Sequence, residues 1–163
     1  MKLRKTQFIF LLIIIATLSR VIPHPPNFTP ITAIALFSIT RLDNKLLASL
    51  IPLICLYISD LFLGFYSINI FVYSSFLLIS LLGHYIGKIN LSSVVLSSIL
   101  FFTISNFGVW LLGYPRTIEG FLTCYVNAIP FFGFTILGDI IYSFLIKFIY
   151  ESLKNKVWAT HSS

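Results

Sequence analysis

The chain has 163 residues and a formal net charge of +6, but only 10% of its residues are charged and 58% are apolar. Soluble domains carry roughly 25% charged residues, because their surface has to be solvated. This composition excludes a water-soluble globule and predicts an all-α membrane protein, since a helix satisfies its own backbone polar groups in lipid. The basic residues stand in short clusters between apolar runs, which is typical of topology signals and not of a nucleic-acid-binding patch.

Apolar segments follow one another along the whole chain, so residues 1–163 are predicted to form a single transmembrane domain. In chain order the segments are Thr6–Ser19, Ile31–Thr40, Leu46–Gly64, Ser67–Gly87, Ile89–Gly113, the amphipathic stretch Tyr114–Gly120, Phe121–Gly133, and a last run from about Phe131 to Tyr150. A bilayer core of about 30 Å needs about 20 helical residues. The first two segments are short, and they can cross only if they are tilted little or if Arg20, Arg41 and Lys45 extend to the interfaces.

The first segment has a basic start and an apolar run, as a cleaved signal peptide would. It lacks a cleavage site of small residues, because Ala16-Thr17-Leu18 is followed by Ser19-Arg20. A retained helix is therefore the preferred interpretation.

The distribution of basic residues predicts about six crossings with both termini in the cytoplasm. Nine of the eleven basic residues then lie inside: Lys2, Arg4, Lys5, Arg41, Lys45, Lys88, Lys147, Lys154 and Lys156. If Ile31–Thr40 were re-entrant, every later helix would invert and most basic residues would lie outside. The sequence therefore predicts a multi-pass protein of the bacterial inner (plasma) membrane, surrounded by lipid.

Three polar residues on three predicted helices reach a similar depth in the outer leaflet. At about 1.5 Å per residue, Asp60 lies about 9 Å below the outer boundary and Asn106 about 6 Å, while Asp139 lies roughly 8–14 Å down. An ionisable residue in a membrane helix is costly unless it faces a partner or a water-filled cavity. Their common depth predicts a polar pocket open to the outside.

Residues of the outer loops lie above this level. The first loop contributes Arg20, His24 and Asn27, and the fifth contributes Arg116. Trp110 fits an interfacial aromatic belt and is also a candidate for stacking on a ligand. The candidate binding residues are Asp60, Asn106, Asp139, Trp110, Arg116 and Asn27. An alternative remains open, in which the two aspartates pair with Arg20 or Arg116 and only join helices.

Signals for catalysis are missing, so the chain is predicted to be neither an enzyme nor a cofactor-binding protein. The sequence contains no metal-ligand spacing, no glycine-rich phosphate loop and no nucleophile elbow. Two aspartates on separate helices could form an intramembrane aspartyl protease dyad. That family shows Tyr-Asp and Gly-x-Gly-Asp, whereas the flanks here are Ile58-Ser59-Asp60 and Leu137-Gly138-Asp139.

Four short motifs stand at intervals from Arg20 to Tyr125. They are Arg20–Pro30 (RVIPHPPNFTP), Ile58-Ser59-Asp60, Ser105–Trp110 (SNFGVW), and the stretch from Gly113-Tyr114-Pro115 to Cys124-Tyr125. With these motifs the chain resembles an uncharacterised bacterial family of integral membrane proteins, known only as a domain of unknown function.

That family is distantly similar to the S components of energy-coupling-factor transporters. The resemblance implies a six-helix bundle that captures a vitamin, a vitamin precursor or a metal ion under its outer loops. It also implies an energising partner, composed of a transmembrane coupling protein and two ATPases. S components commonly present Ala-x-x-x-Ala on an early helix for docking, but here Ala33 and Ala35 lack alanines at positions 37 and 39.

The leading functional prediction is a substrate-binding component of a small-molecule uptake transporter with an outward-facing polar pocket. The alternative is a non-transporting membrane scaffold or assembly subunit, whose polar residues only lock helices together. A cavity lined by Asp60, Asn106 and Asp139 would favour transport, and direct pairing of these residues would favour the scaffold.

Overall fold

A computed structural model describes residues 5–154 of the chain, and within them every regular element is a helix. The six helices are α1 (Lys5–Val21), α2 (Ile31–Arg41), α3 (Lys45–Leu63), α4 (Asn69–Ile86), α5 (Leu91–Gly113) and α6 (Ile118–Leu153). Lys2, Arg4 and Lys156, which enter the predicted charge distribution, lie outside the described residues. The all-α prediction is confirmed.

Four of these helices, α3 to α6, are long and apolar enough to cross a membrane. Their lipid-compatible surfaces carry many exposed leucine, isoleucine and phenylalanine side chains. A helix with such a surface needs an apolar solvent, so the composition and the structure both indicate a membrane protein. The remaining helices are shorter, with 17 residues in α1 and 11 in α2.

Local capping explains where several helices begin. The Asn44 side chain accepts a hydrogen bond from the Leu47 amide at the start of α3. Asn90 and Ser93 form a reciprocal capping box at the start of α5. The Thr117 hydroxyl accepts from the Gly120 amide at the start of α6. Each cap satisfies backbone donors that the first helical turn leaves without a partner.

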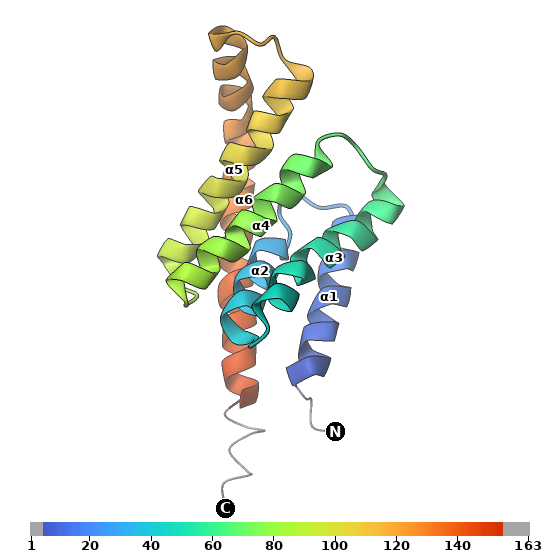
Figure 1. Ribbon diagram of the computed structural model, residues 1–163, viewed down its shortest axis with the longest axis vertical. Coiled ribbons are helices and arrows are strands. Elements are labelled where there is room, and N and C mark those ends of the chain that lie inside the picture. Colours follow the sequence, from blue (N-terminus) through green and yellow to red (C-terminus); the bar gives the residue numbers. More distant parts are fainter. Residues whose placement is uncertain (1–4, 155–163) are drawn as a thin grey trace, which may run out of the picture.

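The short helix α2 forms the centre of the bundle and contacts each of the other five helices (Figure 1). Every residue from Ile31 to Ile39 is buried. The small side chains of Ala33 and Ala35 are fully buried and let neighbouring helices approach closely. A short helix with apolar residues on all sides is stable here because other helices cover it completely.

Successive helices run in alternating directions, so that α1 begins and α6 ends at the same end of the molecule (Figure 1). Two contacts at that end join α6 to other segments. Lys147 Nζ of α6 donates to the Ile89 carbonyl at 3.1 Å, and Glu151 of α6 pairs with Arg41 of α2 at 3.4 Å. The α2–α3 and α4–α5 connections lie there. The α1–α2, α3–α4 and α5–α6 connections lie toward the opposite end.

The structure differs from the sequence pattern at the last segments. Phe121–Gly133 and the run from about Phe131 to Tyr150 form one continuous helix, α6, with Pro130 inside it. Proline removes one backbone hydrogen bond, but membrane helices tolerate this loss when neighbouring groups compensate for it. The upper parts of α5 and α6 extend as a hairpin beyond the other helices (Figure 1).

Gly108 of α5 packs tightly against Phe71 of α4. A Cβ atom placed on Gly108 would lie 2.3 Å from the Phe71 ring. Gly108→Ala is therefore expected to lower the free energy of unfolding by about 1–3 kcal/mol, because the added methyl overpacks the contact.

Gly133→Ala is the matched control for this prediction. It lies in α6 with no atom within 4 Å of the added Cβ. Alanine at this position is expected to be neutral or to stabilise the protein by roughly 0.5–1 kcal/mol. Thermal unfolding of both purified variants in detergent measures the difference, and equal stabilities would contradict a tight α4–α5 contact.

Candidate functional site

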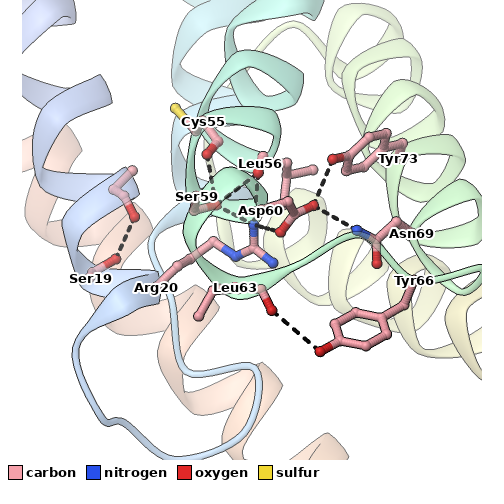
Figure 2. Close-up of polar contacts among 11 residues, drawn as sticks. Ser19, Arg20, Cys55, Leu56, Ser59, Asp60, Leu63, Tyr66, Asn69 and Tyr73 are labelled. Carbon is pink, nitrogen blue, oxygen red and sulfur yellow. Dashed lines mark hydrogen bonds and ion pairs between the residues drawn. The ribbon is translucent and has the colours of Figure 1, made fainter.

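Asp60 is buried between three helices and both of its carboxylate oxygens have partners (Figure 2). Arg20 Nη1 from α1 pairs with Asp60 Oδ1 at 2.8 Å. From α4, Asn69 Nδ2 donates to Oδ2 at 2.9 Å and the Tyr73 hydroxyl donates to it at 2.6 Å. The side chains of Arg20 and Asp60 are 18% and 4% exposed. This network links α1, α3 and α4.

Arg20 has further acceptors on α3. Its Nη1 also donates to the Leu56 carbonyl at 3.2 Å and to the Ser59 hydroxyl. Arg20 lies in the last turn of α1, where a cation is favoured by the negative end of the helix dipole. Asp60 is thus a paired group in a satisfied network, as the alternative helix-joining interpretation predicts for it.

Asp139 has a different environment, although it is a buried aspartate at a similar predicted depth. Its side chain lies on α6 and the residue is 1% exposed. The Ser98 hydroxyl from α5 donates to Asp139 Oδ2 at 2.6 Å, and the Thr32 side chain from α2 makes a second hydrogen bond. The ion pairs found within residues 5–154 are Arg20–Asp60 and Arg41–Glu151, so Asp139 has hydroxyl partners but no cation there.

Asp139 lines a cavity of about 170 Å³, which we call the Asp139 cavity. Every helix or its adjoining loop contributes to the wall. The lining residues are Arg20, His24, Asn27, Thr29, Ile31, Thr32, Leu56, Leu63, Val72, Phe76, Phe101, Thr135 and Asp139. The rings of Phe76 and Phe101 pack against each other with centroids 5.4 Å apart. The cavity therefore combines the Asp139 carboxyl group, the Arg20 side chain, whose guanidinium group is paired with Asp60, and hydroxyl groups with an aromatic wall.

A second cavity of about 180 Å³, the Asn106 cavity, adjoins the first. The two share four lining residues, namely Asn27, Val72, Phe101 and Thr135. Asn106 lines this second cavity, although its side-chain amide also donates to the Phe102 carbonyl of its own helix at 2.8 Å. Together the two cavities reach the lower end of the roughly 300–1,000 Å³ typical of ligand pockets.

The proline-rich loop contributes to the walls of these cavities and has a defined conformation. The Phe28 amide donates to the Pro25 carbonyl at 3.0 Å, and Asn27 has a φ of 60°. A turn with proline at its second position and asparagine with positive φ at its third has the type II form. Asn27 thereby lines both cavities.

The loop is also held against α6. The Phe28 ring packs against Tyr142 with centroids 5.4 Å apart. Gly138 lies so close to Phe28 that an added Cβ would come within 3.1 Å of its ring. Arg20 at the end of α1 thus contacts Asp60, and Asn27 of the loop lines both cavities.

Trp110 and Arg116 do not join the other candidates. They line a separate hollow of about 280 Å³ with Thr117, Ile118 and Phe121. The Trp110 indole donates to the Pro115 carbonyl at 3.1 Å, which connects the end of α5 with the following loop. The structure therefore brings Asp139, Asn106 and Asn27 to adjoining cavities and leaves Trp110 and Arg116 apart. Asp60 lies in the Arg20 network and is not among the residues that line either cavity.

Sequence reasoning missed the hydroxyl residues around Asp139, namely Thr32, Ser98 and Thr135. One signal was available, because Thr135 and Asp139 are four residues apart and so share a helix face. It also missed Asn69 and Tyr73, which are related by the same spacing and both bind Asp60. Ser98 stands in a run rich in serine, and nothing in that run distinguishes it.

Comparison with known proteins identifies a family. The model of a family of unknown function, DUF6580, matches residues 1–160. No curated protein and no solved structure matches the chain. The prediction of an uncharacterised family is confirmed, while the distant similarity to S components remains a prediction.

Proposed function

We propose that this chain, which belongs to family DUF6580, is the substrate-binding component of an uptake transporter that captures a small organic cation. The observation that carries the proposal is Asp139, which is 1% exposed and lines a cavity with no cationic partner among the described residues.

An isolated buried carboxylate is costly, and it is retained where it has a function or a partner. Ser98 and Thr32 hold the carboxyl group in place but supply no positive charge. A protonated amine or an N-heteroaromatic cation would supply that charge. Phe76 and Phe101 line the same cavity and favour the same ligands, because an aromatic ring attracts a cation.

The proposal includes about six crossings in the bacterial plasma membrane, with both termini in the cytoplasm. The alternating helix directions support it. The grouping of basic residues also supports this orientation. One end of the bundle carries Arg41, Lys45, Lys88 and Lys147, whereas Arg20 and Arg116 lie elsewhere. The cavities would then open to the outside through the proline-rich loop.

Topology reporters at Asn44 and Lys88 are expected to give a cytoplasmic signal, while reporters at Tyr66 and Pro115 give an external one. The reason is that positively charged connections stay inside. Alkaline phosphatase and green fluorescent protein fusions measure the two locations. Activity of phosphatase fused at Asn44 or Lys88 would contradict the proposed orientation.

Uptake would require energy from a partner, and similarity to S components suggests a coupling protein with two ATPases. The alanines nearest to the docking pattern, Ala33 and Ala35, are 0% exposed. They offer no surface for a coupling protein, so a partner of this kind would have to dock elsewhere. The chain itself would capture the ligand, and an energising partner would complete the uptake.

A membrane scaffold is the second candidate function, and the Arg20–Asp60 network favours it. This network is fully paired and joins three helices, as a purely structural group would. A scaffold gives no reason for a cavity beside Asp139, which distinguishes the two candidates.

A thermal-shift screen of the purified protein tests the proposal. We expect protonated amines or N-heteroaromatic cations to raise the unfolding midpoint, because a ligand that binds only the folded state stabilises it. Neutral isosteres of each hit are the matched control. A screen in which cations have no more effect than their neutral isosteres would leave the scaffold as the better account.

A further inference from the structure

A groove on the outside of the bundle lies away from the Asp139 cavity and is used by none of the functions above. It has a volume of about 410 Å³ and runs between the start of α3 and the end of α4. Its lining residues are Ile39, Lys45, Leu46, Ser49, Leu77, Leu78, Ser80, Leu81 and His84. The leucines are strongly exposed, from 42% for Leu78 to 72% for Leu46.

One end of the groove carries positive charge. Lys45 Nζ donates to the carbonyls of Ile39 and Leu42, both at 2.8 Å, which leaves its third donor without a partner in these contacts. Lys45 takes part in neither of the ion pairs formed by the described residues. It also stands in the first turn of α3, where the helix dipole adds partial positive charge. His84 adds ring nitrogens at the same end.

The interior of the groove holds a buried polar group without a partner. Ser80 is 1% exposed and its hydroxyl has no hydrogen-bond partner in the structure. Ser80 precedes His84 by four residues, so it lies about 6 Å deeper along α4. An unsatisfied buried hydroxyl costs free energy, and it therefore indicates a ligand that supplies an acceptor or a donor there.

We propose that this groove binds an anionic phospholipid. The phosphate group lies at Lys45 and His84, an ester carbonyl accepts a hydrogen bond from Ser80, and an acyl chain fills the leucine-lined part. The order of these groups matches a phospholipid, whose ester groups lie deeper in the membrane than its phosphate. An anionic headgroup is favoured over a zwitterionic one because Lys45 has no carboxylate to neutralise it.

Native mass spectrometry and thermal unfolding of the purified chain test this site. The probes are phosphatidylglycerol, phosphatidylcholine with the same acyl chains, and inorganic phosphate. We expect phosphatidylglycerol to be retained and to raise the unfolding midpoint more than phosphatidylcholine, and phosphate to have no effect. Equal effects of the two lipids, or an equal effect of phosphate alone, would overturn the proposal.

Variants locate the binding. Lys45→Gln is expected to weaken phosphatidylglycerol binding roughly fivefold, in line with the effect of one basic residue near an anionic lipid surface. Ser80→Ala removes a hydroxyl without a protein partner, so it keeps the fold intact and is expected to reduce retention of the lipid as well.

Lys88→Gln is the matched control, because Lys88 is an exposed cation just beyond the end of α4 that does not line the groove. It is expected to bind phosphatidylglycerol like the parent. If Lys88→Gln lost as much affinity for phosphatidylglycerol as Lys45→Gln, the effect would come from the general surface charge. That result would overturn the proposed site.

Discussion

Replacing Asp60 by asparagine is expected to lower the free energy of unfolding by about 3–5 kcal/mol. The substitution keeps the size of the side chain but removes the negative charge that pairs with Arg20 at 2.8 Å. The guanidinium group, with only 18% of the Arg20 side chain exposed, is then left without its counter-charge. Thermal unfolding in detergent measures the loss.

Two further variants make the Asp60 result specific. Asp43→Asn removes an exposed carboxylate between α2 and α3 and is expected to leave the stability unchanged. The double variant Arg20→Met/Asp60→Leu is expected to recover most of the stability, because it removes both charges together. A parent-like midpoint for Asp60→Asn would refute the network as a structural joint.

Replacing Asp139 by asparagine is expected to weaken binding of the organic cation by about 100-fold or more. Loss of one partner of a buried charge pair costs about 2–5 kcal/mol, and 100-fold corresponds to about 2.7 kcal/mol. Without ligand, the stability of this variant is expected to remain close to that of the parent, because no cation is left unpaired. Calorimetric titration and thermal unfolding measure the two quantities.

The controls for Asp139 separate charge from shape. Asp139→Glu keeps the charge and is expected to bind more strongly than Asp139→Asn, with some loss because the cavity is small. Ser98→Ala removes the hydroxyl that donates at 2.6 Å and is expected to produce a smaller loss of affinity. A destabilisation of Asp139→Asn as large as that of Asp60→Asn would instead place Asp139 in a structural role.

Much of the fold could be predicted because apolar runs of helical length are the strongest signal in a membrane sequence. The ends of α3 and α5 agree with the predicted segments Leu46–Gly64 and Ile89–Gly113 within two residues. The exception is α6, which the sequence pattern divided into Phe121–Gly133 and a run from about Phe131 to Tyr150, next to Pro130 and Gly133. Those residues weaken a helix in water, but in the structure the helix continues through both.

For the site, the sequence predicted only the depth of the polar residues in the membrane. Counting residues placed Asp60, Asn106 and Asp139 at similar heights, but it does not give the direction in which each side chain points. Asp60 faces Arg20 and α4, whereas Asp139 faces α5, α2 and the cavity. These directions depend on how the helices pack around α2, which is a long-range property of the fold.

The identity of an aspartate in the sequence also does not show whether its carboxylate is paired with a cation. Arg20 was an equally good partner for either aspartate on the basis of sequence. Its place in the last turn of α1, beside α3, decides the pairing in favour of Asp60. The two aspartates therefore differ in the roles that we assign to them, one joining helices and the other serving a ligand.

Binding of a radiolabelled cation from the screen to oriented membrane vesicles tests the central claim most directly. Right-side-out vesicles that contain the chain are predicted to bind the cation saturably without any energising partner, and those with Asp139→Asn at the same protein level are predicted not to. Inside-out vesicles are predicted to bind little. Equal binding by the parent and Asp139→Asn, or binding confined to inside-out vesicles, would contradict an outward-facing site at Asp139.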